Sequence, residues 1–186
     1  MAVDSQAFKR AMAQFAAGVT VVTTAGGERP IGLTANSFTS VSLDPPLVLV
    51  CIQAQLHAHQ AIQQNKVFAV SLLGAHQLDY GMRFAGLQKD VVDRFAGTVW
   101  KTAVTGSPVL PECLAWFDCE LWNVFPGGDH SIFVGEVVAL GVGEKESHPL
   151  LYHNRLWRRT EAIEASAPKR ARPMRARAPK TRTRKR

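Results

Sequence analysis

Short neutral polar side chains are concentrated in residues 31–46, IGLTANSFTSVSLDPP, near the start of the chain. Such a segment can present a row of hydrogen-bond donors and acceptors to one ligand. A half-buried strand with a solvated polar face explains the same pattern equally well, so the segment alone leaves both interpretations open. Its uncharged polar residues are Thr34, Asn36, Ser37, Thr39, Ser40 and Ser42.

A histidine follows two glycines and an aspartate in PGGDH, residues 126–130, between two long apolar runs. The glycines permit positive φ and allow the backbone to approach a flat ligand closely. At the mouth of such a hairpin, His130 can donate to a carboxamide or carry a proton. The turn is also typical of an ordinary exposed connection, and taken alone it favours that interpretation.

Other patterns that could carry chemistry are weak. His57 and His59 are two residues apart on an expected helix and point in different directions, which favours exposed histidines over metal ligands. The sequence contains no GxSxG, GxGxxG or GxxxxGK[ST] motif. Arg83, Lys89 and Arg94 could meet a phosphate, although surface charge is the commoner role for any one of them.

The basic charge is concentrated at the C-terminal end. Residues 166–186 hold ten basic and no acidic side chains, and subtracting these ten charges from +7 leaves −3 for residues 1–165. Nothing in that balance points to a nucleic-acid-binding surface. We expect one domain over residues 1–165 and a dispensable, disordered basic tail, with weak polyanion binding by the tail as the alternative.

The cysteines and the hydropathy pattern favour a reducing cytoplasm. Cys51, Cys113 and Cys119 form no CxxC pair, so buried reduced thiols are expected rather than disulfides or a zinc site. Charged and polar residues interrupt the N-terminal segment, and no signal peptide is expected. No apolar run approaches the length of a membrane helix.

Apolar periodicity predicts the elements that position these side chains. Asp4 or Ser5 can cap a helix whose apolar residues, Phe8, Met12 and Phe15, continue at helical spacing until Gly18. Further helices are expected at residues 57–65 and 76–85. Strands are expected at residues 19–24, 47–52, 67–73, 114–125 and 131–142, with residues 150–160 closing the domain.

The alternation of apolar residues slips inside the polar segment. Leu33 and Val41 occupy odd positions, whereas Phe38 occupies an even one. A bulge or corner near residues 37–40 explains this slip. Because strands outnumber the peripheral helices, we expect a closed or nearly closed antiparallel barrel.

Five segments resemble, in order, the flavin reductase-like family, the small reductase components of two-component flavin-dependent monooxygenases. They are FAAGVTVVTT, IGLTANSFTSVSLDPPLVLVCI, HQLDYGMRFAG with DRFAG, GGDHSIFVGEV and PLLYHNRLW. The resemblance spans about residues 8–157, which is most of the expected domain. It implies a mainly β fold with peripheral helices, an antiparallel Greek-key split β-barrel of the FMN-binding type.

The resemblance also implies the residues of the site. His130 is the implied catalytic residue, and it would contact the nicotinamide together with Asp129, Tyr152 and Trp157. No metal is expected. The residues implied to hold the flavin are Thr34, Ala35, Asn36, Ser37, Ser40, Val41, Cys51, Ile52, Gln53, His57, Ala58, Phe84 and Lys89.

The implied activity is reduction of FMN or FAD by NADH or NADPH, followed by transfer of the reduced flavin to a separate monooxygenase. The implied assembly is a cytoplasmic homodimer that shares its flavin sites between subunits. An electron carrier that retains its FMN is an alternative, as is a pyridoxamine-phosphate-oxidase-like or haem-binding split barrel, because a fold does not fix a function. Nucleic-acid binding would rest on the tail alone.

Overall fold

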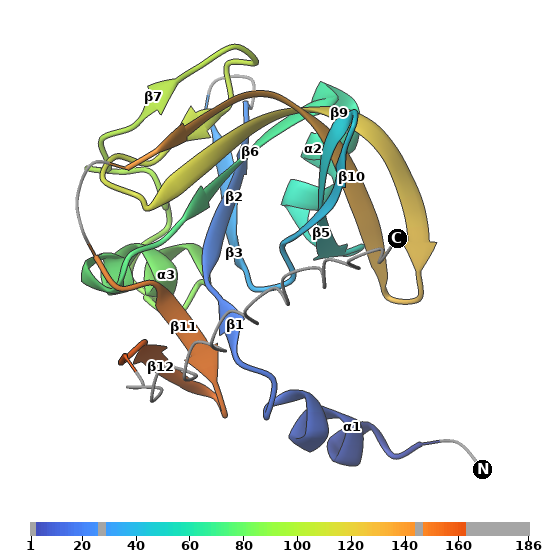
Figure 1. Cartoon of the computed structure of the whole chain (residues 1–186), viewed down its shortest axis with the longest axis vertical. Helices are drawn as coiled ribbons and strands as arrows, with labels where there is room; N and C mark the ends of the chain where they lie inside the picture. Colours follow the sequence, from blue (N-terminus) through green and yellow to red (C-terminus); the bar gives the residue numbers. More distant parts are fainter. Residues whose placement is uncertain (1–2, 26–28, 144–146, 163–186) are drawn as a thin grey trace, which may run out of the picture.

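A computed structural model describes residues 3–25, 29–143 and 147–162. Within them, a seven-stranded sheet curls into a barrel in the order β3-β2-β6-β9-β10-β5-β4, and every neighbouring pair is antiparallel (Figure 1). The strands are β2 Thr20–Thr24, β3 Ile31–Ala35, β4 Thr39–Leu43, β5 Pro46–Gln53, β6 Val67–Leu72, β9 Ala115–Gly127 and β10 His130–Val142. The expected mainly β barrel is confirmed.

Smaller elements surround the barrel. A three-stranded sheet has the order β1-β11-β12, and a two-stranded sheet pairs β7 with β8. No helix in the described part of the chain is long and apolar enough to cross a membrane. The bounds are α1 Ser5–Met12, β1 Ala17–Gly18, α2 His57–Asn65, a 3₁₀ turn at Ala75–Gln77, α3 Leu78–Phe84, β7 Lys101–Thr102, β8 Pro108–Val109, β11 Leu150–His153 and β12 Leu156–Arg159.

Two apolar clusters lie on opposite faces of β2, whose residues are all buried. Val22 belongs to the barrel interior, where Ile62 of α2 packs among side chains such as Phe68 and Phe133. Val21 belongs to the second cluster, which α3 and the three-stranded sheet cover. Because both faces are covered, the continuous β-branched run of β2 is favourable here.

The polar segment forms the corner between the two end strands of the barrel sheet. The chain leaves β3 at Ala35 and enters β4 at Thr39. A register shift between Ser40 and Ser42 then places a bulge at Val41. The expected corner and bulge are therefore confirmed, and β3 and β4 do not pair with each other.

The first helix ends earlier than its apolar spacing suggests. α1 begins after Asp4, whose side chain accepts from the Ala7 N–H at 2.7 Å, and it ends at Met12. The N–H of Asn154 donates to the Ala13 carbonyl at 2.7 Å, and residues 17–18 form β1 instead. The expected extension to Gly18 was wrong because a distant strand pair competes for this backbone.

The remaining expectations differ only in detail. The helix at residues 57–65 is confirmed, whereas the segment at 76–85 divides into a 3₁₀ turn and α3. The β9–β10 hairpin is confirmed, with Gly128 at φ 76° in a connection of only two residues. The expected tail at residues 166–186 lies outside the described residues.

A glycine on β10 allows close packing inside the barrel. An added Cβ at Gly135 would lie 2.4 Å from Phe68 Cζ and 2.8 Å from Cys119 Cβ. Phe68 and Cys119 are both fully buried, so neither can move into solvent. We expect Gly135→Ala to lower the free energy of unfolding by about 1–3 kcal/mol through overpacking.

Urea unfolding followed by circular dichroism measures this effect. Gly18→Ala is the matched control, because an added Cβ there meets no atom within 4 Å. Unfolding midpoints that are the same for Gly135→Ala and the wild type would contradict this packing.

Candidate functional site

A cavity of about 290 Å³, here called the corner pocket, lies where β3 meets the corner. Three residues expected to hold a flavin line it, Thr34, Ala35 and Asn36, together with the two aromatics expected at the nicotinamide. The rings of Tyr152 and Trp157 contact each other edge to face, with centroids 5.2 Å apart. The complete lining is Val19, Thr34, Ala35, Asn36, Ala85, Leu87, Tyr152 and Trp157.

A second cavity of about 450 Å³, here called the α2 cavity, lies at the N-terminal end of α2. No side chain caps this helix, whose N-cap residue is Leu56. Unpaired N–H groups and the helix dipole favour an anion at such an end. The lining combines positively charged, negatively charged and apolar side chains. It consists of Arg29, Pro30, Ile31, Gly32, Leu33, Leu56, His57, Ala58, Val92, Asp93, Arg94 and Phe95.

The strand β3 connects the two cavities. Its residues Ile31, Gly32 and Leu33 line the α2 cavity, and Thr34 and Ala35 line the corner pocket. Neutral polar groups and aromatic rings thus lie at one end of the strand. Two arginines lie at the other, where Arg29 pairs with Asp93 at 3.6 Å and Arg94 adds a further positive charge. A ligand with a flat neutral end and an anionic end matches this distribution of groups.

Two hydroxyl groups of the polar segment bind the protein itself. The Ser37 hydroxyl donates to the Cys51 carbonyl and accepts from the Cys51 N–H, both at 3.0 Å, which joins the corner to β5. The Thr34 hydroxyl donates to the Gly81 carbonyl at 2.8 Å and so holds α3 against β3. These hydroxyls shape the corner, whereas Asn36 is exposed in the pocket wall.

The other residues expected at the flavin are spread along neighbouring strands. Ser40 and Val41 are exposed on β4. Ile52 on β5 is 1% exposed and points into the barrel core, so only its backbone is available to a ligand. Phe84 is buried against Phe95. These four residues line neither the corner pocket nor the α2 cavity. The same holds for Lys89.

The Asp129–His130 pair lies at the tip of the β9–β10 hairpin. His130 pairs with Gln53 across the strands, and the Ala54 N–H donates to the Asp129 carbonyl at 3.0 Å. Nδ1 of His130 lies 2.7 Å from Oδ1 of Asp129, and this hydrogen bond, with the charge of His130, lowers the pKa of Asp129. Neither residue lines the corner pocket or the α2 cavity, whereas Tyr152 and Trp157 both line the corner pocket.

The two histidines of α2 have different environments. His57 is exposed and lines the α2 cavity. His59 was expected to be exposed, which was wrong: its Nε2 lies 2.9 Å from Ser131 Oγ and its ring meets Phe133 edge on. His59 is buried because α2 packs against the barrel interior, and helical spacing alone does not show which face of the helix does so.

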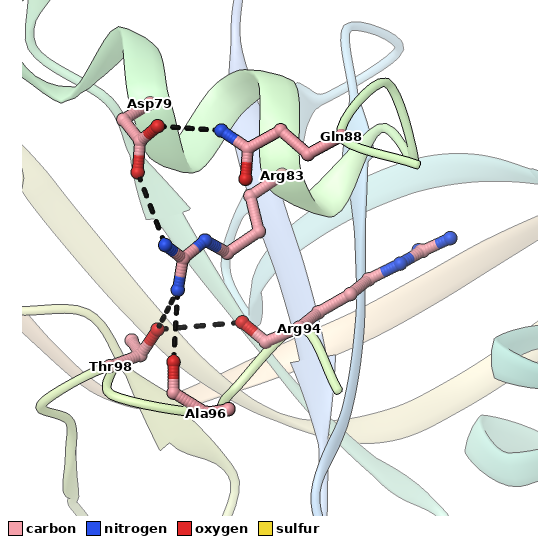
Figure 2. Close-up of polar contacts among 6 residues, drawn as sticks. All are labelled: Asp79, Arg83, Gln88, Arg94, Ala96 and Thr98. Atoms are coloured by element: carbon pink, nitrogen blue, oxygen red, sulfur yellow. Dashed lines mark hydrogen bonds and ion pairs between the residues drawn. The ribbon is translucent and has the colours of Figure 1, made fainter. Parts of the chain in front are cut away.

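Arg83 and Arg94 both form hydrogen bonds within the protein. Their guanidinium groups donate to backbone carbonyls near the end of α3, as Figure 2 shows for Arg83 and Ala96. Arg94 also lines the α2 cavity. Sequence reasoning missed Arg29 and Leu87 as lining residues, and no motif distinguishes either of them.

Comparison with known proteins identifies the family. The chain matches the model of the Flavin reductase like domain over residues 12–161. It is 36% identical over 152 residues to the flavin-dependent monooxygenase, reductase subunit HsaB, of Mycobacterium tuberculosis, covering 81% of this chain and 80% of that protein. It is 42% identical over 137 residues to a probable flavin reductase of Rhizobium meliloti, covering 73% of this chain but only 43% of that longer protein.

A solved structure agrees with this match. The NADH:FAD oxidoreductase SgcE6 of Streptomyces globisporus superposes with a TM-score of 0.78 at 37% sequence identity, covering 87% of this chain and 98% of that one. The resemblance seen in the five sequence segments is thereby confirmed. The chain belongs to the flavin reductase-like domain family.

Proposed function

We propose that the protein reduces FMN or FAD with NADH or NADPH and passes the reduced flavin to a separate monooxygenase. The observation that carries this proposal is the pair of cavities joined by β3. One is lined by neutral polar and aromatic side chains, and the other carries Arg94 and the Arg29–Asp93 ion pair, whose atoms are 3.6 Å apart. A flavin needs hydrogen bonds at its ring edge and cations or N–H groups at its phosphate. The names of the relatives, a monooxygenase reductase subunit and an NADH:FAD oxidoreductase, support the same activity.

In this proposal, the flavin ring lies at the corner pocket and its phosphate lies at the α2 cavity. Bound flavin supplies the redox chemistry, and the protein supplies orientation and exclusion of water. Asn36 would bind the ring edge, and the α2 N-terminus, with Arg29 and Arg94 nearby, would bind the phosphate. Thr34 and Ser37 hold the corner in place through their bonds to Gly81 and Cys51.

A direct assay tests the activity. Purified protein is mixed with NADH or NADPH, with and without added FMN or FAD, and nucleotide oxidation is followed at 340 nm. We expect oxidation to depend on added flavin. Nucleotide oxidation that no added flavin stimulates would contradict a reductase that releases its product, and tightly retained flavin would favour the electron carrier.

We also propose that the active form is a homodimer. His130 lies at the tip of the β9–β10 hairpin, Tyr152 and Trp157 line the corner pocket, and in the proposed dimer a second copy completes the site. Large apolar side chains are exposed on α1, β4, β9 and β10, including Phe8, Met12, Leu43, Trp122 and Leu140. Such exposure favours an interface between protein chains. Light scattering that showed an active monomer would contradict this assembly.

A reducing compartment is the location that we propose. The described thiols Cys51, Cys113 and Cys119 are free. Burial raises the pKa of Cys119 to about 12, with Asp118 adding to the effect, and also raises that of Cys113. Both raised pKa values favour the protonated thiol, which is the less reactive form.

Removing the amide of Asn36 should weaken flavin binding. Asn36 is the exposed polar residue of the corner pocket, and its loss leaves polar groups of the ring unpaired. We expect Asn36→Ala to weaken FMN or FAD binding by about 1–3 kcal/mol. Fluorescence titration measures this affinity. Gln64→Ala, on the exposed face of α2, is the matched control, and equal affinity in the Asn36 and Gln64 variants would refute the placement.

His130 should act on the nicotinamide and not on flavin affinity. Hydride transfer needs the two rings held at close contact, so a small misplacement is costly. We expect His130→Ala to lower kcat/KM for NADH by about tenfold to a thousandfold while flavin affinity stays near wild type.

Steady-state kinetics and flavin titration on the same sample separate the two roles. Asp129→Asn is the matched variant: it keeps the turn and removes the charge that faces His130. If His130→Ala loses flavin affinity but oxidises NADH normally at saturating flavin, the residue belongs to the flavin site.

A further inference from the structure

The tetrapeptide Arg-Phe-Ala-Gly occurs twice, at residues 83–86 and 94–97. The first copy ends α3, and the second follows the loop at residues 87–93. Both copies end in a left-handed glycine, with φ 72° at Gly86 and 68° at Gly97. Since L side chains rarely adopt this conformation, glycine suits both positions.

The two copies bind each other reciprocally. Nη1 of Arg83 donates to the Ala96 carbonyl of the second copy at 3.0 Å (Figure 2). Nη1 of Arg94 donates to the Phe84 carbonyl of the first copy at 2.8 Å. The rings of Phe84 and Phe95 pack between them edge to face, with centroids 4.9 Å apart at 78°. We call this arrangement the RFAG clasp.

Further hydrogen bonds tie the clasp to its surroundings. Arg83 also contacts the Asp79 carboxylate at 3.5 Å and the Thr98 hydroxyl at 3.4 Å, and Thr98 donates to the Arg94 carbonyl. Arg94 donates to the Gly32 carbonyl of β3 at 3.1 Å. The clasp therefore links α3, both ends of the loop and the strand that joins the two cavities.

The loop held by the clasp forms part of both cavity walls. Leu87 lines the corner pocket, and Val92 and Asp93 line the α2 cavity. Lys89, expected near the flavin phosphate, lies in the same loop. Arg83 lines neither cavity; it faces a separate hollow beside His76 and Tyr80. The guanidinium of Arg83 therefore acts on a ligand in these cavities indirectly, through the backbone segments that it binds.

We propose that the RFAG clasp preorganises residues 87–93 for flavin binding and that Arg83 is a positioning residue of this device. The proposal rests on the flavin site proposed above. A loop that is already fixed at both ends loses little conformational freedom when the ligand binds, so that loss subtracts little from affinity. Without the clasp, the loop must be ordered by the flavin itself.

Arg83→Met tests this role, because methionine keeps an apolar stem and removes every guanidinium bond. We expect the Kd for flavin to rise by about tenfold, which corresponds to the ordering of a few side chains. The kcat at saturating flavin and NADH should stay within about twofold. Arg83→Lys should restore part of the affinity, since one amine can still reach the Ala96 carbonyl.

Trypsin cleavage after Lys89, in the absence of flavin, reports on the loop independently of activity. We expect faster cleavage in Arg83→Met than in wild type. Arg159→Met, on the exposed end of β12, is the matched control and should change neither readout. Thr98→Val is a second variant that keeps both arginines and removes two weaker bonds, and its effects should be smaller and in the same direction.

The outcomes separate this proposal from the proposed function. Wild-type protein that binds no flavin would refute the proposed flavin site, whereas the cleavage rates would still test the clasp. Unchanged flavin affinity and unchanged cleavage in both folded variants would overturn the clasp. A fall in kcat with unchanged Kd would also overturn it, because Arg83 would then act on the reaction and not on the loop.

Discussion

Among the described strands, β3 is hydrogen-bonded to a neighbour on one side only, and the candidate site depends on what replaces the second neighbour. An unpaired strand edge leaves backbone groups that must find other partners. Here Arg94 binds the Gly32 carbonyl, and the Ser37 hydroxyl links the corner that follows β3 to Cys51 on β5. Side chains therefore bind the backbone beside the unpaired edge of β3, and the cavities next to this strand leave room for a ligand.

The two ends of the short strand β3 line different cavities. Gly32 lacks a side chain where Phe84 and Phe95 approach, and an added Cβ there would lie 2.8 Å from the Phe84 ring. The close packing brings α3 and the loop at residues 87–93 against β3. As a result, the corner pocket at Asn36 and the α2 cavity share β3 as a wall.

Local patterns in the sequence predicted most of the fold. The helix at residues 57–65, the long hairpin and the corner near Ser37 follow from spacing, turn residues and a slip in alternation, all of which are local signals. The end of α1 and the burial of His59 could not be predicted this way. Each depends on a partner far along the chain, Asn154 in one case and Ser131 in the other.

Part of the lining of the corner pocket was predictable as well. Asn36, Tyr152 and Trp157 were expected to serve one reaction, and the fold brings them to one pocket. The hydroxyl partners of Thr34 and Ser37 are backbone carbonyls on other elements, so residue type alone suggested ligand contacts instead. The two RFAG segments are visible in the sequence, but their reciprocal bonds depend on how the loop folds back on α3.

A crystal structure of the FMN complex tests the central claim most directly, since it shows which end of the flavin lies in which cavity. We expect the ring edge within hydrogen-bonding distance of Asn36 and the phosphate at the first N–H groups of α2, near Arg94. A phosphate bound in the corner pocket, or a flavin bound away from β3, would contradict it.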